Sequence, residues 1–136
     1  MDMGSAFANI NWLSVIVASI SSFLVGGIWY GPLFGKAWMH AFRFTKSDLN
    51  TRNMPKVFGL SLLLAFVAAL NLELFIGVNA DISFGLIAGF LAGFGWVATL
   101  LGILYLFENR SFKAFLINAG YCILALTLMG GILGAW

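Results

Sequence analysis

Glu73 is the one acidic residue that lies well inside an apolar stretch of this sequence. It follows Ser61, Ala65 and Ala69 at helical spacing, and Gly77 continues the series. Small residues at this spacing form a helix face that packs closely against another helix, so Glu73 is expected to face a helix bundle and not lipid. Carboxylates inside a membrane are costly and often functional. The chemistry that Glu73 could supply is the binding of a proton, a metal ion or an amine-bearing ligand.

A simpler role for Glu73 is also consistent with its position. It lies about four residues from the end of its apolar stretch, which is roughly 6 Å at the rise of an α-helix. At that depth the carboxylate could reach water, or it could form a hydrogen bond with a neighbour such as Asn71. The sequence leaves these alternatives open.

A few other polar and aromatic side chains lie within apolar stretches. Asn118 is expected to make hydrogen bonds between helices, because buried amides need partners; lining a polar cavity is the alternative. Trp96 is expected to pack and to donate its indole N–H to a neighbouring helix, or else to form a wall of a ligand cavity. Tyr30, Tyr105 and Tyr121 are expected to anchor the protein at the level of the lipid head groups. The residues of the hypothetical ligand- or ion-binding site are Glu73, Asn71, Trp96 and Asn118.

The sequence contains no pattern typical of a catalytic or metal site. His40 is the single histidine and Cys122 the single cysteine, whereas a metal site needs three or four converging ligands. There is no nucleophile with an adjacent base and no phosphate-binding loop. We therefore expect no catalytic residue and no metal ion, and the sequence identifies no cofactor.

The composition indicates that lipid surrounds the chain. Of its 136 residues, 62% are hydrophobic and 9% are charged, and the mean hydropathy is +1.01. A soluble domain would have about 25% charged residues. So small a globule cannot bury this much apolar surface from water. Residues 1–136 are therefore expected to form a single transmembrane domain.

Four apolar stretches reach the roughly 20 residues that cross a hydrocarbon core of about 30 Å. They cover residues 10–30, 57–78, 82–107 and 112–134. Open sheets cannot satisfy their backbone groups in lipid, and the stretches lack the alternation of barrel strands. The predicted fold is all-α: an integral membrane four-helix bundle with a loop over residues 32–55.

Every lysine and arginine falls in the two loops on one side of such a bundle. They are Lys36, Arg43, Lys46, Arg52, Lys56, Arg110 and Lys113. Asp2 and Asp81 lie on the opposite side, which carries no cation. The positive-inside rule therefore predicts that both basic loops are cytoplasmic and that both termini lie outside. On this topology Glu73 has no cationic partner on its own side of the membrane.

The loop over residues 32–55 is expected to contain a short amphipathic helix at the inner membrane interface. Lys36, His40 and Arg43 share one helical face. The apolar residues of the other face are Leu33, Phe34, Trp38, Ala41 and Phe42. Such a helix places its cations against anionic lipid, so the expected partner of this loop is the membrane and not nucleic acid.

Small residues also recur along the third apolar stretch. Gly85, Gly89 and Gly93 share one helical face, and a second face has small residues as well. The second set is Ala88, Ala92, Gly95, Thr99 and Gly102. Because such stripes let helix backbones approach closely, this helix is expected to have two neighbours, one of which could be another copy of the chain. We therefore expect a homo-oligomer or a larger membrane complex.

The first apolar stretch ends at a sharp turn. The residues of this turn are Trp29, Tyr30, Gly31 and Pro32. Proline lacks an amide hydrogen and disfavours helix in the residue before it, so the helix is expected to end near Gly31. With Asn11 and Trp12, the segment from Gly27 to Trp38 resembles the signature of a bacterial family of small membrane proteins catalogued as a domain of unknown function. The resemblance implies four spans in a bacterial inner membrane, and it implies no activity.

Three functions are compatible with these features. In the first, an oligomeric bundle binds or passes a small cationic or amphipathic solute, with Glu73 as the charged group. In the second, the chain is an accessory subunit that packs against a larger membrane complex through its small residues. In the third, it is a membrane enzyme that acts on lipid or quinone, which its few reactive side chains disfavour. We favour the first.

Overall fold

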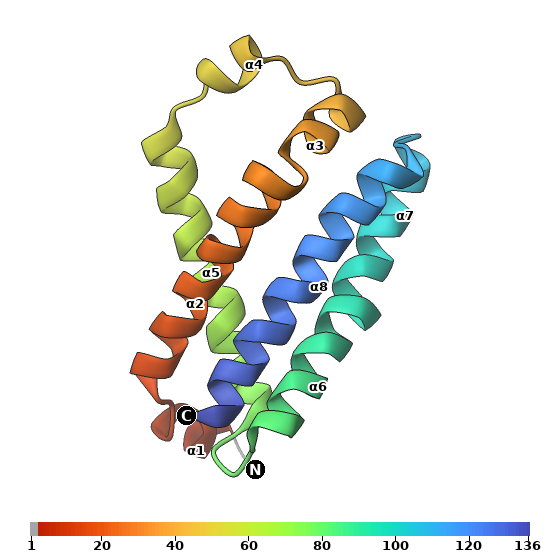
Figure 1. Cartoon of the computed structure of the whole chain (residues 1–136). Helices are drawn as coiled ribbons and strands as arrows, with labels where there is room; N and C mark the ends of the chain where they lie inside the picture. The colour runs from red at the N-terminus through yellow and green to blue at the C-terminus, as the bar shows by residue number, and fades with distance from the viewer. Residues whose placement is uncertain (1–2) are drawn as a thin grey trace.

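The computed structural model describes residues 3–136, and these residues fold into helices joined by short turns (Figure 1). In chain order the elements are α1 (Met3–Ala8), α2 (Trp12–Ile28), the π-helix η1 (Trp29–Leu33), α3 (Gly35–Phe42), α4 (Lys46–Asn50), α5 (Met54–Ile76), α6 (Ile82–Ala92), the π-helix η2 (Gly93–Ala98), α7 (Thr99–Phe107) and α8 (Phe112–Ala135). Asp2 lies outside the described residues.

Four helical segments are long and apolar enough to cross a membrane. They cover Trp12–Leu33, Met54–Ile76, Ile82–Phe107 and Phe112–Ala135. The first joins α2 to η1, and the third joins α6, η2 and α7. No strand occurs between residues 3 and 136. The prediction of an all-α membrane bundle is therefore confirmed.

Polar side chains determine where the spans begin. At four helix starts, an Asn, Asp or Ser side chain accepts the backbone N–H of the residue three positions further along. These caps are Asn11 before α2, Asn53 before α5, Asp81 before α6 and Ser111 before α8. Each cap satisfies a backbone donor that would otherwise lack a partner, so the start of each span is fixed by its own sequence.

The first span ends at Leu33, two residues beyond the predicted end near Gly31, and Pro32 lies inside its last turn. After Ile28 the helix widens into η1 and continues through Pro32 to Leu33. The backbone N–H of Phe34 donates to the carbonyl oxygen of Trp29 at 2.8 Å. This hydrogen bond spans five residues and closes the turn without an N–H from Pro32. The chain then enters α3 at Gly35, where a Cβ atom would collide with the Tyr30 carbonyl oxygen.

Helix α8 is the central element, because it packs against α2, α5, α6 and η2. Its closest neighbour is α6, and glycines lie where the two backbones meet. A Cβ atom on Gly85 would overlap the carbonyl oxygen of Gly130, and one on Gly130 would overlap that of Gly85. A Cβ atom on Gly89 would likewise overlap the Leu126 carbonyl oxygen. Only residues without a side chain allow this approach.

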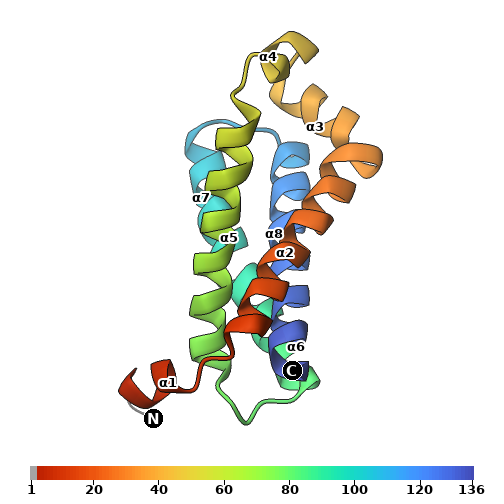
Figure 2. The ribbon, with the colours of Figure 1, turned by 90° about the vertical axis from the view of Figure 1, so that its left-hand side faces the viewer.

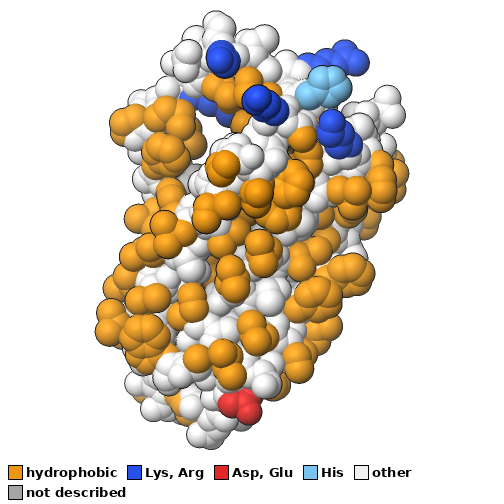
Figure 3. Space-filling view, in the orientation of Figure 1, with side chains coloured by type: hydrophobic (Ala, Val, Ile, Leu, Met, Phe, Trp, Pro, Cys, Tyr) orange, Lys and Arg blue, Asp and Glu red, His pale blue; other side chains and the backbone are white. Residues whose placement is uncertain are grey.

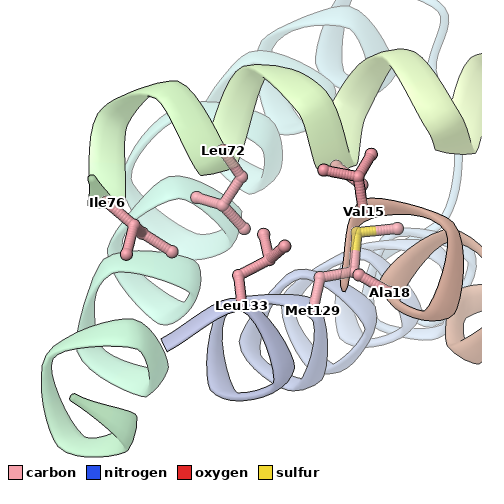
Figure 4. Packing of buried hydrophobic residues seen from close by; sticks show 7 residues of the cluster. Val15, Ala18, Leu72, Ile76, Met129 and Leu133 are labelled. Atoms are coloured by element: carbon pink, nitrogen blue, oxygen red, sulfur yellow. The ribbon is translucent and has the colours of Figure 1, made fainter. Parts of the chain in front are cut away.

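The hydrophobic core lies in the half of the bundle that contains the termini (Figure 4). Its buried members come from α2, α5 and α8: Val15, Ala18, Ala69, Leu72, Ile76, Met129 and Leu133. The other half of the bundle is more open. Residues 54–64 of α5 are all exposed, and this part of α5 diverges from α2 toward α4 (Figure 1).

Helices α3 and α4 form the opposite end of the molecule, where the basic residues gather. In the face shown in Figure 3, the Lys, Arg and His side chains lie at this end and an acidic side chain lies at the other. The aromatic face of α3 packs on the bundle: the rings of Trp38 and Tyr30 lie 5.4 Å apart, and those of Phe42 and Tyr105 lie 6.2 Å apart. Protein, and not only lipid, therefore covers this face.

Candidate functional site

Glu73 lies near the end of α5 and is 7% exposed. The face predicted to be buried is buried at this depth, since Ala69 one turn earlier is fully inaccessible. The Oε2 atom of Glu73 has no hydrogen-bond partner, and it is the one buried side-chain N or O atom of residues 3–136 in that condition. An unsatisfied buried carboxyl oxygen costs free energy unless a proton or a cation supplies the missing interaction.

A cavity of about 230 Å³ adjoins Glu73 at the end of the bundle that contains the termini. Three separate parts of the chain enclose it together with α5. The α1–α2 connection contributes Asn9 and Asn11, the first turn of α2 contributes Ser14, and the chain end contributes Trp136. Helix α1 projects sideways from this end of the bundle, beyond the end of α5 (Figure 2). The residues around the cavity therefore include a glutamate, two asparagines, a serine and a tryptophan.

Hydrogen bonds hold part of this polar set in place. The Ser14 hydroxyl donates to the Asn11 carbonyl oxygen at 2.8 Å, and Asn11 Oδ1 accepts the Ser14 backbone N–H at 3.2 Å. Asn9 Nδ2 donates to the Ser5 carbonyl oxygen at 2.8 Å. Within residues 3–136, Asn9 Oδ1 and Asn11 Nδ2 make no hydrogen bond, so both remain able to bind a ligand.

The turn after α5 shapes the wall of the cavity next to Glu73. Gly77 ends the helix with a φ of 78°, and its N–H donates to the Glu73 carbonyl oxygen at 3.0 Å. Other residue types rarely adopt this conformation, which makes glycine the suitable residue here. Asp81 lies beyond the turn, and its Oδ1 caps α6 by accepting the Phe84 N–H at 2.8 Å.

The other predicted site residues do not line the Glu73 cavity. Asn71 is exposed, and its side chain makes no hydrogen bond among the described residues. Trp96 is 61% exposed on the outer surface, where its ring lies 6.0 Å from that of Phe75. Asn118 belongs to a separate cluster. The cavity residues that the sequence did not suggest are Asn9, Asn11, Ser14 and Trp136, which lie near the chain ends and just outside or at the edges of the apolar stretches.

Asn118 is at the centre of the second polar cluster. The Tyr30 hydroxyl donates to Asn118 Oδ1 at 2.6 Å, and Asn118 Nδ2 donates to the Tyr105 hydroxyl at 2.6 Å. The Tyr121 hydroxyl donates to the Ser22 carbonyl oxygen at 3.1 Å. The tyrosines that were expected to anchor the chain at the lipid head groups also join helices through their hydroxyl groups. Buried hydroxyl groups bond to protein where no water is available.

The residues of the predicted turn at 29–32 take part in the same helix contacts. Trp29 Nε1 donates to the Ile117 carbonyl oxygen at 2.8 Å, and the Trp29 ring lies against Gly120, where a Cβ atom would come within 2.8 Å. The Tyr30 ring lies 5.3 Å from that of Tyr121. Trp29 and Tyr30 therefore attach the end of the first span to α8.

The described residues contain no group of three or more His, Cys, Asp or Glu side chains that could hold a metal ion. The Glu73 cavity contributes one carboxylate.

A family model described as "Protein of unknown function (DUF1761)" matches residues 13–134 of the chain. This range contains both Glu73 and residues 29–32. The match confirms the resemblance to a family of unknown function. No curated protein and no solved structure matches the chain.

Proposed function

The chain belongs to the DUF1761 family of proteins of unknown function, and we propose that it binds a small cationic or amphipathic solute in the Glu73 cavity. The observation that carries the proposal is the buried Oε2 atom of Glu73, which has no partner among the described residues and adjoins a cavity of about 230 Å³. A positive group in this cavity would supply the interaction that the carboxylate lacks.

The charges around the cavity favour a cation over an anion. No lysine or arginine occurs from residue 57 to residue 109, the segment that contains Glu73 and the turn to α6. Asp81 adds a second carboxylate at this end of the bundle. The indole ring of Trp136 provides an aromatic face, which attracts an ammonium group. An organic ammonium ion would interact with the carboxylate, the free Asn9 amide oxygen and the indole ring together.

The distribution of cations supports an outward-facing cavity. All lysines and arginines lie in the loops at the α3–α4 end or next to them, whereas the cavity lies at the other end. By the positive-inside rule the α3–α4 end faces the cytoplasm, and both termini and the Glu73 cavity lie outside a bacterial inner membrane. The solute would then reach the cavity from the outside.

Passage of the solute across the membrane would require more than one copy of the chain. No described residue of α7 is buried, and the four spans leave many large apolar side chains exposed. A homo-oligomer would cover part of this surface and could enclose a path between copies.

The proposal is tested by measuring binding to the purified protein in nanodiscs. Ethylammonium, tetramethylammonium and potassium ions serve as probes, and thermal unfolding reports binding. A probe at about 100 times its Kd stabilises the protein by about 2.7 kcal/mol. The variant Glu73→Gln should lose this stabilisation, whereas Glu108→Gln, an exposed acid at the opposite end, should retain it. If the probe stabilises both variants equally, Glu73 is not part of the binding site.

Transport is tested separately in proteoliposomes. The wild-type protein should take up the probe that stabilises it, and Glu73→Gln should abolish uptake. Binding without uptake would indicate a receptor or a sensor in place of a transporter.

An accessory role is the second candidate, and the open half of the bundle favours it. Residues 54–64 of α5 are exposed on all sides, which leaves room for a partner helix. Native mass spectrometry after mild solubilisation distinguishes the two functions. A homo-oligomer that retains a small ligand supports solute binding, and a second protein at fixed stoichiometry supports the accessory role.

A further inference from the structure

Two arginines from different loops lie over a stacked pair of phenylalanine rings at the α3–α4 end. The rings of Phe42 and Phe44 are 5.6 Å apart with an angle of 10° between their planes. The Arg52 guanidinium lies 4.9 Å from the centre of the Phe44 ring, and the Arg110 guanidinium lies 5.2 Å from the centre of the Phe42 ring. Guanidinium groups at these distances are attracted to the ring faces. We call these four residues the Arg–Phe cluster.

The cluster is attached to the bundle. Phe42 packs at 6.2 Å against the ring of Tyr105, whose hydroxyl accepts the hydrogen bond from Asn118. Trp38 lies 5.1 Å from Phe44. The chain reverses at Arg43, which has a φ of 57°, and the Phe44 N–H donates to the Met39 carbonyl oxygen at 2.9 Å. The two guanidinium groups are therefore held on a fixed surface.

The acidic residues at this end compensate the charge of the cluster only in part. Asp48 Oδ2 accepts the Thr45 backbone N–H at 2.8 Å and closes the cap of α4. Glu108 lies 3.4 Å from Arg110, and both side chains are about half exposed. Arg52 has no carboxylate partner among the described residues. Because all seven lysines and arginines of the chain lie at or next to this end, against Asp48 and Glu108, the surface keeps a net positive charge.

Exposed apolar side chains adjoin Arg110 on both sides in the sequence. Phe107, the last residue of α7, is 89% exposed, and Phe112, the first residue of α8, is 72% exposed. Arg110 thus lies between two span ends whose rings face the surroundings. A ligand that is anionic at one end and apolar beyond it matches this arrangement, whereas free phosphate matches only the arginines.

We propose that the Arg–Phe cluster binds the phosphate of an anionic phospholipid, with the acyl chains along the exposed ends of α7 and α8. Guanidinium groups bind phosphate oxygens through paired N–H donors, and the rings beneath them leave these donors available at the edges. The lipid would connect the α4–α5 loop, which contains Arg52, to the α7–α8 turn, which contains Arg110. The site is distinct from the Glu73 cavity and lies at the opposite end of the bundle.

The test is a native mass spectrometry titration of the full chain with phosphatidylglycerol and with phosphatidylcholine of the same acyl chains. The wild-type protein should prefer phosphatidylglycerol. The double variant Arg52→Gln, Arg110→Gln should lose about tenfold or more of its affinity for that lipid, given the usual contribution of each basic residue near an anionic membrane. The matched control Lys36→Gln, Lys56→Gln removes the same charge from the same end and should lose much less.

Two further measurements separate a defined site from general attraction. The variant Arg52→Lys, Arg110→Lys keeps the charge and removes the planar donor groups, and it should also lose the preference. Equal losses from the site and control variants, or none from either, would overturn the proposal. Glycerol phosphate without acyl chains should not displace the lipid at equal concentration. If it does, the site binds a soluble phosphate and the lipid proposal is wrong.

Discussion

The hydroxyl group of Tyr30 donates a 2.6 Å hydrogen bond to Asn118, a residue 88 positions away in the chain. Asn118 in turn donates to the Tyr105 hydroxyl, also at 2.6 Å. The first span, α8 and α7 are joined in this way at one level of the bundle. Because lipid offers no competing hydrogen bonds, this chain of polar groups determines how the end of the first span sits against its neighbours.

Removing one end of this chain should destabilise the protein modestly. Tyr30→Phe should lower the free energy of unfolding by about 1 kcal/mol, since hydrogen bonds between helices in membranes contribute roughly 0.6 to 1.7 kcal/mol. Asn118→Leu should cost more, because it leaves two tyrosine hydroxyls without their partner. Unfolding in mixed detergent micelles measures both. The double variant should cost less than the sum of the single variants, and strict additivity would show that the two residues do not interact.

The contact between α6 and α8 predicts a contrast between two glycines. Gly85→Ala should destabilise the protein by about 1–3 kcal/mol, because its Cβ atom would overlap the Gly130 carbonyl oxygen and force the helices apart. Gly59→Ala on α5 is the control, since nothing lies within 4 Å of its Cβ position. It should leave stability unchanged or slightly higher. Similar losses for both would indicate that close packing of α6 on α8 is not important for stability.

The cap of α4 should respond to pH. The Thr45 backbone N–H holds the pKa of Asp48 below its usual range. A carboxyl group whose pKa is lower in the folded state than in the unfolded state stabilises the fold at pH values above its unfolded-state pKa. This stabilisation is lost as the pH falls through the folded-state pKa. The NMR Cα shifts of residues 46–50 should therefore lose helical character in acid. In Asp48→Asn they should show no such transition, and an identical transition there would exclude Asp48 as the cause.

Some features of the fold follow from local chemistry and could be predicted from sequence. The apolar composition predicts helices in lipid, and the spacing of Gly85 and Gly89 predicts a face for a close neighbour. The path at Pro32 could not be predicted, because a proline usually ends a helix and here the wider turn of η1 bypasses the missing donor. Local propensity does not reveal the contact of Trp29 with Ile117 and Gly120 that accompanies this turn.

The candidate site was predictable only in part for a similar reason. Glu73 stands out because it is an acid in an apolar stretch, but its neighbours in space come from the far ends of the sequence. Asn9 and Asn11 precede the first span and Trp136 is the last residue, so no spacing rule links them to α5. Trp96 was predicted as a site residue because it lies in the middle of a span. No neighbouring helix covers its side chain, which is 61% exposed.

The predicted orientation can be tested by labelling. Lys46→Cys and Asp81→Cys, each in a Cys122→Ser background, place single thiols at the two ends of the bundle. A membrane-impermeant maleimide added to intact spheroplasts should label the thiol at position 81, and it should label position 46 only after permeabilisation. This follows from the positive-inside rule. Labelling of both positions from the same side would contradict the four-span topology and, with it, the outward-facing cavity.

The unpartnered carboxyl group predicts an unusual stability effect at Glu73. Glu73→Leu should raise the free energy of unfolding of the ligand-free protein by about 1 kcal/mol, since an apolar side chain removes the cost of a buried oxygen without a hydrogen bond. Glu108→Leu, at an exposed site, should change it by less than about 0.5 kcal/mol. The Glu73→Leu protein should also no longer be stabilised by an ammonium probe. A loss of stability in Glu73→Leu would mean that the carboxyl group is satisfied in the folded protein, and the case for a cation in this cavity would then fail.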